Sequence, residues 1–332
     1  MTASSGRLPD LGVLEPALAL RLTEGMESVE AGLLAAVRSD YPFVTEASKY
    51  LVEAGGKRFR PLLVLLAAEF GDPHAPGVVP AAVVAELTHL ATLYHDDVMD
   101  EADLRRGAAS ANARWDNSVA ILTGDFLFAK SSGILADLGP EAVRIQAHTF
   151  ERLCTGQIRE TIGPEDGLDP VEHHIQVIAD KTASLIATSG RYGSLMAGCD
   201  PATVDLLTDF GERIGIAFQL ADDIVDITSD SRDSGKVPGT DLREGVPTLA
   251  ALIALSGDLD PRFRDLLSRP LPDDDDHAEA LELLRGHDAL ARARAEARRW
   301  ADLAREALEP LPAIPARDAM SVLCDYVVTR TG

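Results

Sequence analysis

Apolar residues recur at helical spacing along most of this 332-residue chain, and the pattern predicts an all-α fold. Segments rich in Ala, Leu and Arg place apolar side chains at positions i, i+3, i+4 and i+7, which gives each predicted helix one face to bury. Runs of alternating β-branched residues between tight turns are missing from the sequence, so we expect little or no sheet. Glycine and proline clusters predict breaks between helices at 71–76, 163–170, 256–261 and 270–277.

The last third of the chain contains an acidic run and a long amphipathic segment. Four consecutive aspartates at 273–276 follow Pro272 and have no apolar period, so we interpret them as a solvent-exposed loop. Residues 282–308 are predicted to be helical and to serve packing rather than function. The residues of this segment expected in the core are Leu283, Leu284, Leu290, Trp300, Leu303 and Leu308.

One acidic motif occurs twice. Asp-Asp-Val-Met-Asp at 96–100 returns as Asp-Asp-Ile-Val-Asp at 222–226, each time after an apolar segment with helical periodicity. On a helix, the first and fifth residues of such a motif share a face, and the second flanks them. The carboxylates concerned are Asp96, Asp97 and Asp100 in the first cluster and Asp222, Asp223 and Asp226 in the second.

Such clusters predict a metal site. Three carboxylates at the end of an apolar helix repel one another unless a cation lies between them, and hard oxygen donors suit Mg²⁺ together with substrate phosphates. A single acidic motif in this acidic chain has an equally good interpretation as a solvated helix face. Two copies with basic residues nearby favour metal–diphosphate chemistry, with the two clusters facing each other. Because they lie 126 residues apart yet must meet one ligand, we expect a single all-α domain around a central cavity.

Composition narrows the function classes. The formal net charge of −23 argues against nucleic acid as a partner. The three cysteines, Cys154, Cys199 and Cys324, have neither disulfide nor zinc spacing, which is typical of a reducing compartment. The first residues resemble no signal peptide, and no uninterrupted apolar run reaches about 18 residues, so we expect a cytoplasmic protein without a membrane span.

Basic and polar residues accompany the acidic clusters. The segment Gly55–Pro61 combines glycines with cations that suit a phosphate. His89 falls on the helix face of the first cluster, where we interpret it as a phosphate contact. The adjacent cations Arg105 and Arg106 follow that cluster, and Lys181 and Thr182 are predicted to begin another apolar helix. Near the second cluster lie Gln219, one turn before Asp223, and Lys236.

Taken together, the chain resembles the trans-prenyltransferase (polyprenyl synthetase) family over roughly residues 40–330. The resemblance rests on motifs in family order: Gly-Gly-Lys-Arg-Phe-Arg-Pro at 55–61, His-Asp-Asp-Val-Met-Asp at 95–100 with Arg-Arg-Gly after it, Gly-Asp at 124–125, Lys-Thr at 181–182 and Phe-Gln-Leu-Ala-Asp-Asp-Ile-Val-Asp at 218–226.

The resemblance implies an isoprenoid-synthase-type helix bundle, with residues 1–332 as one polyprenyl synthetase domain, 1–20 as a loosely ordered N-terminal segment, and a homodimer. It implies condensation of isopentenyl diphosphate with an allylic diphosphate, with the six motif aspartates and Lys181 as the catalytic set and about three Mg²⁺ per site. It places the allylic diphosphate on those metals and on Arg105, Lys181 and Lys236, and Thr182 and Gln219 are further substrate-binding residues. It places isopentenyl diphosphate on Lys57, Arg60, His89 and Arg106.

One position departs from the family pattern. Glu244-Gly245 is followed by Val246, where the family commonly has a lysine, so one diphosphate-binding cation is missing and affinity for the allylic substrate is in question.

Product length depends on the residues below the first cluster. Ala91 and Thr92, one helical turn deeper than Asp96, are small where short-chain relatives have bulky aromatics. Phe126 and Phe128 are the next candidates for a tunnel floor, although ordinary core packing explains them equally well. We therefore predict a product from hexaprenyl to decaprenyl, with a farnesyl or geranylgeranyl product as the alternative.

Two other functions stay open. A class I terpene cyclase also ionises allylic diphosphates, but it has a different second metal motif and an aromatic-lined cavity. A non-catalytic partner subunit would be expected to lose an acidic cluster, and both clusters are intact.

Overall fold

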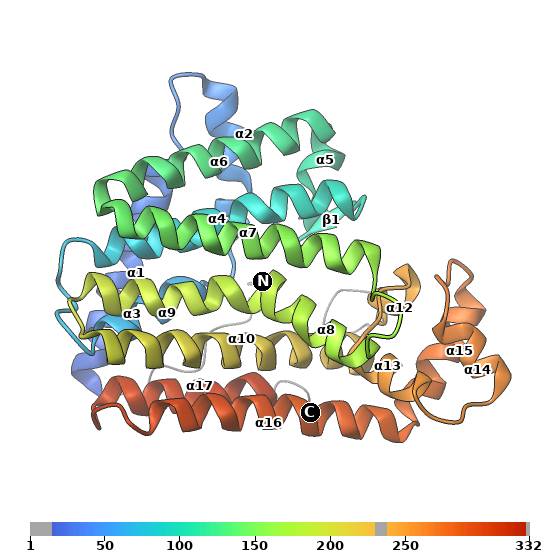
Figure 1. The fold of residues 1–332 in the computed structure, drawn as a ribbon. Helices are drawn as coiled ribbons and strands as arrows, with labels where there is room; N and C mark the ends of the chain where they lie inside the picture. The colour runs from blue at the N-terminus through green and yellow to red at the C-terminus, as the bar shows by residue number, and fades with distance from the viewer. Residues whose placement is uncertain (1–14, 230–237, 330–332) are drawn as a thin grey trace. The chain divides into compact units, whose positions relative to one another are not determined.

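The computed structural model describes residues 15–229 and 238–329, and its regular elements in these ranges are helices and one antiparallel hairpin of two two-residue strands (Figure 1). The predicted all-α class is confirmed. The chain forms two compact units, which are described one at a time. Unit 1 comprises residues up to Thr149, Leu185–Thr208 and Pro310–Met320, and unit 2 comprises Phe150–Ser184, Asp209–Glu309 and the residues from Ser321.

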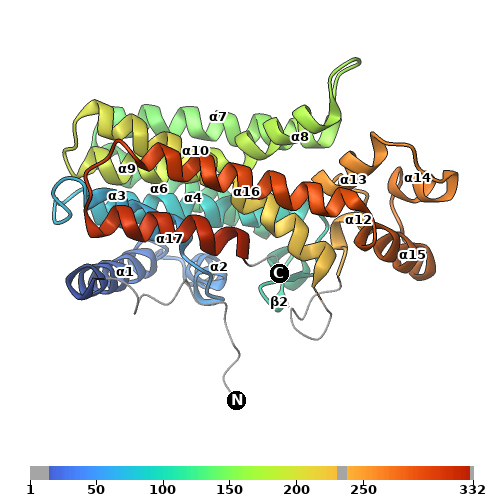
Figure 2. The same ribbon diagram turned by 90° about the horizontal axis from the view of Figure 1, so that it is seen from below.

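Unit 1 is built on the pairing of two long helices. Its complete elements are α1 (Pro16–Ala36), α2 (Pro42–Glu53), α3 (Phe59–Ala68), α4 (Val78–Met99), β1 (Leu104–Arg105), β2 (Ala108–Ala109), α5 (Ala111–Arg114) and α6 (Asn117–Leu138). Helices α4 and α6 pack along each other, while α1 and α3 pack on α4 (Figure 2). The unit also contains the start of α7 (Pro140–Ile162), most of α9 (Ser184–Met196), and the first residues of α10 (Pro201–Thr228) and α17 (Pro315–Thr329).

Helix α1 begins earlier than the sequence suggested. We expected residues 1–20 to be loosely ordered, yet the helix starts at Pro16. The Glu15 carboxylate accepts the backbone N–H groups of Ala17 and Leu18, so it caps the free donors of the first turn. Leu18 is completely buried and anchors the first turn of α1 to the core, while Leu20 is 59% exposed.

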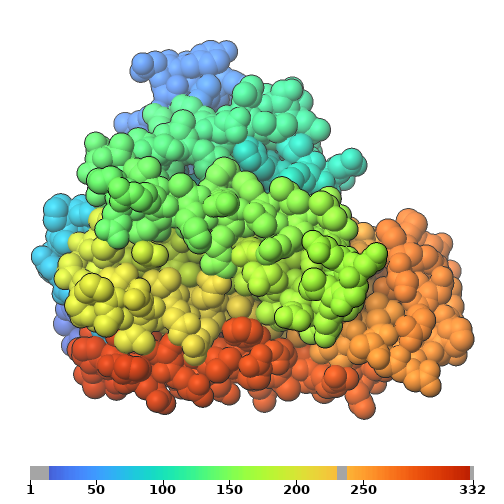
Figure 3. Space-filling view, in the orientation of Figure 1, coloured from blue at the N-terminus to red at the C-terminus, as the bar shows by residue number. Residues whose placement is uncertain are grey.

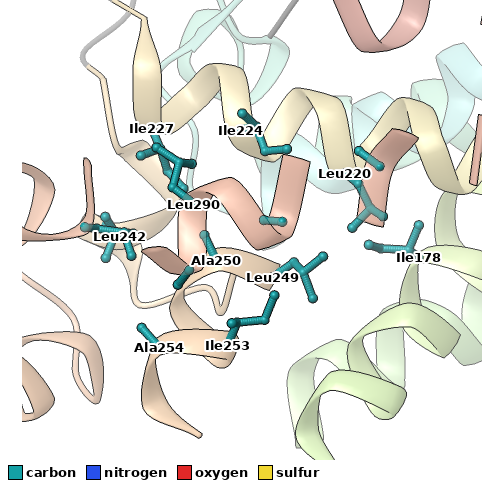
Figure 4. Close-up of a cluster of buried hydrophobic side chains, with 14 of the residues drawn as sticks. Ile178, Leu220, Ile224, Ile227, Leu242, Leu249, Ala250, Ile253, Ala254 and Leu290 are labelled. Carbon is teal, nitrogen blue, oxygen red and sulfur yellow. The ribbon is translucent and has the colours of Figure 1, made fainter. Parts of the chain in front are cut away.

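Unit 2 surrounds the second half of α10. Its other elements are α8 (Pro170–Ile178), a π-helical turn η2 (Ala179–Ala183), α12 (Thr240–Glu244), α13 (Leu249–Leu255), α14 (Pro261–Leu267), α15 (Asp274–Arg285) and α16 (Asp288–Leu308). One face of α10 contributes Leu220, Ile224 and Ile227 to an apolar core shared with α12, α13 and α16 (Figure 4). This core fixes the rotation of α10 and turns its acidic residues away from the apolar cluster.

The acidic run at 273–276 is not the loop that we predicted. Asp273 is the N-cap of α15, and its carboxylate accepts the N–H groups of Asp275 and Asp276. Negative charge is favoured at a helix N-terminus, and Asp276 also pairs with Arg262 and Arg269. The polarity of residues 273–276 led us to predict a loop, but these residues form the N-terminal cap and first turn of a helix.

The predicted helix at 282–308 is divided at Gly286 and His287, where α15 ends and α16 begins. Leu284, Leu290 and Leu308 are buried as predicted, while Trp300 and Leu303 are partly buried. Leu283 is 40% exposed, so its assignment to the core was wrong. The helix break shifts the register of the apolar face, which a single continuous period could not reveal.

Candidate active site

The first acidic cluster lies at the C-terminal end of α4, with Asp100 as the C-cap residue. Asp97 points inward and is fully buried, and its Oδ1 accepts a hydrogen bond from Arg105 Nε at 2.5 Å. Burial raises the pKa of Asp97, and the Arg105 guanidinium opposes that rise. In the structure, Asp97 thus holds Arg105, while Asp96 is half-buried and Asp100 is exposed.

A tight hairpin after this cluster presents two arginines. Strands β1 and β2 pair Arg105 with Ala108, and Arg106 adopts a left-handed conformation with φ of 54°. The Arg106 guanidinium donates to the carbonyl of Leu51 at 2.9 Å and to that of Gly55. Gly56 has a φ of 145°, a conformation that favours glycine, and a Cβ there would lie 2.8 Å from Arg106 Nη2, so a side chain would also displace this guanidinium.

The two arginines of the segment Gly55–Pro61 have different surroundings. Arg58 is buried and pairs with Glu30 at 2.6 Å and with Glu86 at 2.8 Å, so its charge is neutralised within the protein. Burial lowers the pKa of Arg60 to about 10, and Arg60 Nε is a buried donor without a hydrogen-bond acceptor. Lys57, on the same segment, is exposed.

His89 lies close enough to Arg60 and Arg106 in unit 1 to feel their positive charges. Burial lowers the pKa of His89 well below 6.5, and the positive charges of Arg60, Arg106, Arg105 and Arg58 lower it further. The imidazole is therefore neutral near pH 7. A buried guanidinium donor beside a neutral histidine and further arginines suits an anion with several oxygens, such as a diphosphate.

The second acidic cluster lies in the last two turns of α10. Asp223 is buried and accepts a hydrogen bond from Gln219 Nε2 at 2.9 Å, while His174 Nε2 lies 3.5 Å from its other oxygen. The Gln219 carbonyl in turn accepts from Thr182 Oγ1 at 3.1 Å. This contact brings together two residues that sequence analysis placed separately.

Asp226 and Asp241 form an acidic pair that the sequence analysis did not find. The Asp226 carboxylate accepts the backbone N–H groups of Thr240 at 3.3 Å and Asp241 at 3.2 Å. Burial, followed by repulsion from Asp226 and Asp223, raises the pKa of the Asp241 carboxyl to about 8. Its sequence signal was its position in Gly-Thr-Asp, five residues after Lys236.

Lys181 and Thr182 do not begin an apolar helix, as we had expected, but lie in the π-helical turn η2. The extra residue of a π turn re-aims side chains, and such turns are frequent at functional sites. The Lys181 ammonium pairs with Glu160 of α7, a second acidic residue that sequence analysis overlooked.

The predicted metal ligands do not form a ready binding site, and one predicted substrate-binding residue lies outside the residues that the structure describes. Among residues 15–229 and 238–329, no three acidic, histidine or cysteine side chains converge into a ready metal site. Asp97 and Asp223, the second residue of each cluster, are both buried. Lys236 lies outside the described residues. Val246 follows a left-handed Gly245 and is 37% exposed.

The proposed chain-length residues lie on α4 and α6. Ala91 is fully buried, while Thr92, Phe126 and Phe128 are partly buried. The Phe128 ring lies 5.8 Å from that of His95, and the Lys130 ammonium lies 5.1 Å from the Phe126 ring. A cavity of about 640 Å³ in unit 1 is lined by the N-terminal turns of α4 and the C-terminal turns of α6, at the end of α4 away from Asp96.

Comparison with known proteins agrees with this description. The sequence profile of the Polyprenyl synthetase family matches residues 41–284, and the chain belongs to that family. It is therefore an enzyme of the transferase class.

Related proteins span the chain almost completely. It is 48% identical to a nonaprenyl diphosphate synthase of Mycobacterium tuberculosis, covering 97% of both chains. A geranylgeranyl pyrophosphate synthase of Corynebacterium glutamicum, solved with calcium and isoprenyl diphosphate, is 46% identical with a TM-score of 0.85, over 96% of this chain and 98% of that one. A decaprenyl diphosphate synthase of Rhodobacter capsulatus is 35% identical with a TM-score of 0.87, over 95% and 99%.

Proposed function

We propose that the protein is a Mg²⁺-dependent trans-prenyltransferase that condenses isopentenyl diphosphate with an allylic diphosphate to give a long-chain all-trans polyprenyl diphosphate. The observation that carries the proposal is the pair of Asp-Asp-x-x-Asp clusters, each at the C-terminal end of a long helix, in a member of the polyprenyl synthetase family. The protein acts in the cytoplasm, which agrees with its three free cysteines.

The acidic residues suit divalent cations. Both clusters lie at helix C-termini, where the helix dipole disfavours anions, so each adds repulsion that a bound cation would relieve. Burial, followed by repulsion from Asp226 and Asp223, raises the pKa of Asp241, and a bound cation would relieve that repulsion. Oxygen-only donors of this kind suit Mg²⁺, about three ions per site, held by the six motif aspartates. The metal supplies stabilisation of the charge that develops on the departing diphosphate.

The basic residues divide between the two substrates. Arg105, Lys181, Thr182, Gln219 and Lys236 bind the allylic diphosphate with the acidic clusters. Arg60, Arg106 and neutral His89, together with Lys57, bind isopentenyl diphosphate. The buried Arg60 Nε without an acceptor supports this second assignment, because a diphosphate oxygen would satisfy it.

The reaction needs positioning more than proton transfer by the protein. The allylic C–O bond breaks, the diphosphate leaves with the electron pair, and the isopentenyl double bond attacks the allylic carbon. The proton lost from the resulting cation passes to the released diphosphate. The protein holds both diphosphates by arginine, lysine and histidine donors, so that the reacting carbons stay adjacent.

The long-chain product is supported by small residues and by relatives. Ala91 and Thr92 are small residues of α4 about one helical turn before Asp96, where an aromatic ring would be expected to close a product tunnel. The relative at 48% identity is a nonaprenyl synthase, while the geranylgeranyl synthase at 46% supports the short-chain alternative. If Phe126 or Phe128 closes the tunnel, the product will be the shorter one.

We also propose a homodimer that uses α6. The helix is apolar enough by length and composition to cross a membrane, with a mean hydropathy of 1.4, a test that core helices of soluble proteins also pass. Only 33% of that stretch is buried, and Ile121 and Leu122 are 42% and 66% exposed. Figure 3 shows the green surfaces of α6 and α7 on the viewer's side. A second copy covering α6 would account for its apolar exposed side.

Product sizing tests the proposed function. The purified protein is incubated with Mg²⁺, labelled isopentenyl diphosphate and farnesyl or geranylgeranyl diphosphate, and the dephosphorylated alcohols are separated by chromatography. We expect a ladder that ends beyond geranylgeraniol. A ladder that stops at farnesol or geranylgeraniol would keep the reaction and reverse the long-chain assignment. No incorporation by folded protein would favour a terpene cyclase or a partner subunit.

A further inference from the structure

Asp180, the residue before Lys181, has no part in the reaction described above, yet three donors hold its carboxylate. It is 5% exposed. Arg152 Nε donates to Oδ1 at 2.9 Å, Gln176 Nε2 donates to Oδ2 at 3.0 Å, and Arg159 Nη1 donates to the same oxygen. The two arginines come from α7 and the glutamine from α8, so side chains of two other helices fix this position of η2.

Arg152 also joins η2 to α10. Its Nη1 and Nη2 donate to the two oxygens of Glu212 at 2.9 and 2.5 Å, and Nη2 donates to the carbonyl of Ala179 at 3.0 Å. Glu212 precedes Gln219 by about two helical turns on α10. The hydrogen bonds with Glu212, and then those with Asp180, raise the pKa of Arg152, so this bridge stays charged.

The backbone of Lys181 is in direct contact with α7. A Cβ at Gly156 would lie 2.5 Å from Lys181 N, so only glycine allows this approach. Arg152, Gly156 and Arg159 occupy one face of α7 at spacings of four and three residues. Below the Arg152 bridge, Thr182 contacts Gln219, and Gln219 contacts Asp223. Two separate bridges therefore join η2 to α10, one at Glu212 and one through Gln219, which reaches Asp223 at the acidic end.

Structural stabilisation alone does not explain this network well. Buried ion pairs are weak evidence for stability, because desolvation offsets much of their attraction. Here the paired charges surround a π turn, which is a costly backbone arrangement often retained at functional sites. The residues that this turn displays are Lys181 and Thr182.

We infer that Asp180, held by Arg152 and Arg159, is a positioning residue for the allylic diphosphate: it fixes η2 so that Lys181 and Thr182 are presented with the acidic end of α10. The inference rests on the proposed function, since it takes Lys181 as a ligand of that diphosphate. Asp180 itself touches no reacting atom.

A double-mutant cycle between Asp180→Asn and Lys181→Ala tests the inference. Asp180→Asn is expected to raise KM for the allylic diphosphate by about 10- to 100-fold, the range found when a residue that orients a metal ligand is lost. KM for isopentenyl diphosphate should not change. In the Lys181→Ala background, Asp180→Asn should add no further rise, because its effect passes through Lys181.

Matched variants separate positioning from folding. Asp209→Asn removes an exposed ion pair with Arg213 on the same helix α10 and should leave both KM values unchanged. If Asp180→Asn does not fold, Arg159→Gln replaces it in the cycle, because Arg159 is half-exposed and its loss keeps the Arg152 bridge.

The outcomes distinguish the two claims. Independent, multiplying effects of the two substitutions, or equal effects on both KM values, would overturn the positioning role. A normal allylic KM in Asp180→Asn beside a raised one in Lys181→Ala would do the same. A normal KM for the allylic diphosphate in Lys181→Ala would contradict the proposed role of Lys181 as a ligand. The positioning role of Asp180 depends on that ligand and would be contradicted as well.

Discussion

Arg58 and Arg60 lie two positions apart in one basic segment, and their surroundings give them different tasks. Arg58 is neutralised by Glu30 and Glu86, each 28 residues away in sequence, whereas Arg60 keeps a buried donor without an acceptor. The resemblance selected Lys57 and Arg60 as ligands. It could not show that Arg58 has a structural role, because Glu30 and Glu86 lie far from the motif in sequence and nothing in the motif identifies them as partners.

Replacing Arg58 should therefore reduce stability, whereas replacing Arg60 should weaken substrate binding. Arg58→Met leaves Glu86 buried without its partner, so we expect the free energy of unfolding to fall by about 3–5 kcal/mol. Arg60→Met should leave stability nearly unchanged and raise KM for isopentenyl diphosphate. Urea unfolding and steady-state kinetics of both variants measure this. A destabilised Arg60 variant with normal kinetics would reverse the two assignments.

His89 should titrate differently with and without diphosphate. Burial and the nearby arginines depress its pKa in the free protein, so its contribution to stability is present above about pH 6.5 and is lost as the pH falls. Isopentenyl diphosphate would neutralise those arginines and raise the pKa of His89. NMR titration of the imidazole, assigned by comparison with His89→Gln, measures both values. A pKa that stays the same on binding would argue against a diphosphate beside His89.

At the scale of elements, periodicity predicted the helices that carry both acidic clusters, and the structure has them as α4 and α10. The π turn η2 was not predictable, because its apolar pattern continues that of α8 and its arrangement depends on Asp180 and two arginines of α7. The acidic cap of α15 was missed because composition without a cap pattern favoured a loop. Asp241 was missed because its pairing with Asp226 is a tertiary contact.

Product length should respond to the size of the α4 residues below Asp96. Ala91→Phe would place an aromatic ring one turn beneath the first cluster, so we expect shorter products in the chromatographic assay. Ala91 is fully buried, and overpacking there can cost about 1–3 kcal/mol. Thr92→Phe at a partly buried position therefore serves as the second variant. An unchanged product profile in both folded variants would contradict a tunnel along this part of α4.

For the whole molecule, the single domain predicted from the sequence and the homodimer both stay predictions. The exposed apolar residues of α6 are the observation that favours a second copy. Leu122→Asp places a charge at a residue that is 66% exposed in the single chain, so the chain itself should tolerate it. We expect this variant to sediment as a monomer while the parent protein sediments as a dimer. If the parent protein sediments as a monomer, or if the Leu122→Asp variant sediments as a dimer, α6 does not form the proposed interface.

The most direct test of the central claim measures Mg²⁺-dependent incorporation of labelled isopentenyl diphosphate by the parent protein, Asp96→Ala and Asp223→Ala. Our account gives both clusters one reaction, so each variant should keep the helical circular dichroism of the parent and lose at least about 100-fold in turnover. The parent should also lose turnover when the metal is chelated. Full activity in both folded variants would contradict the assignment of the repeated motif to metal-dependent prenyl transfer.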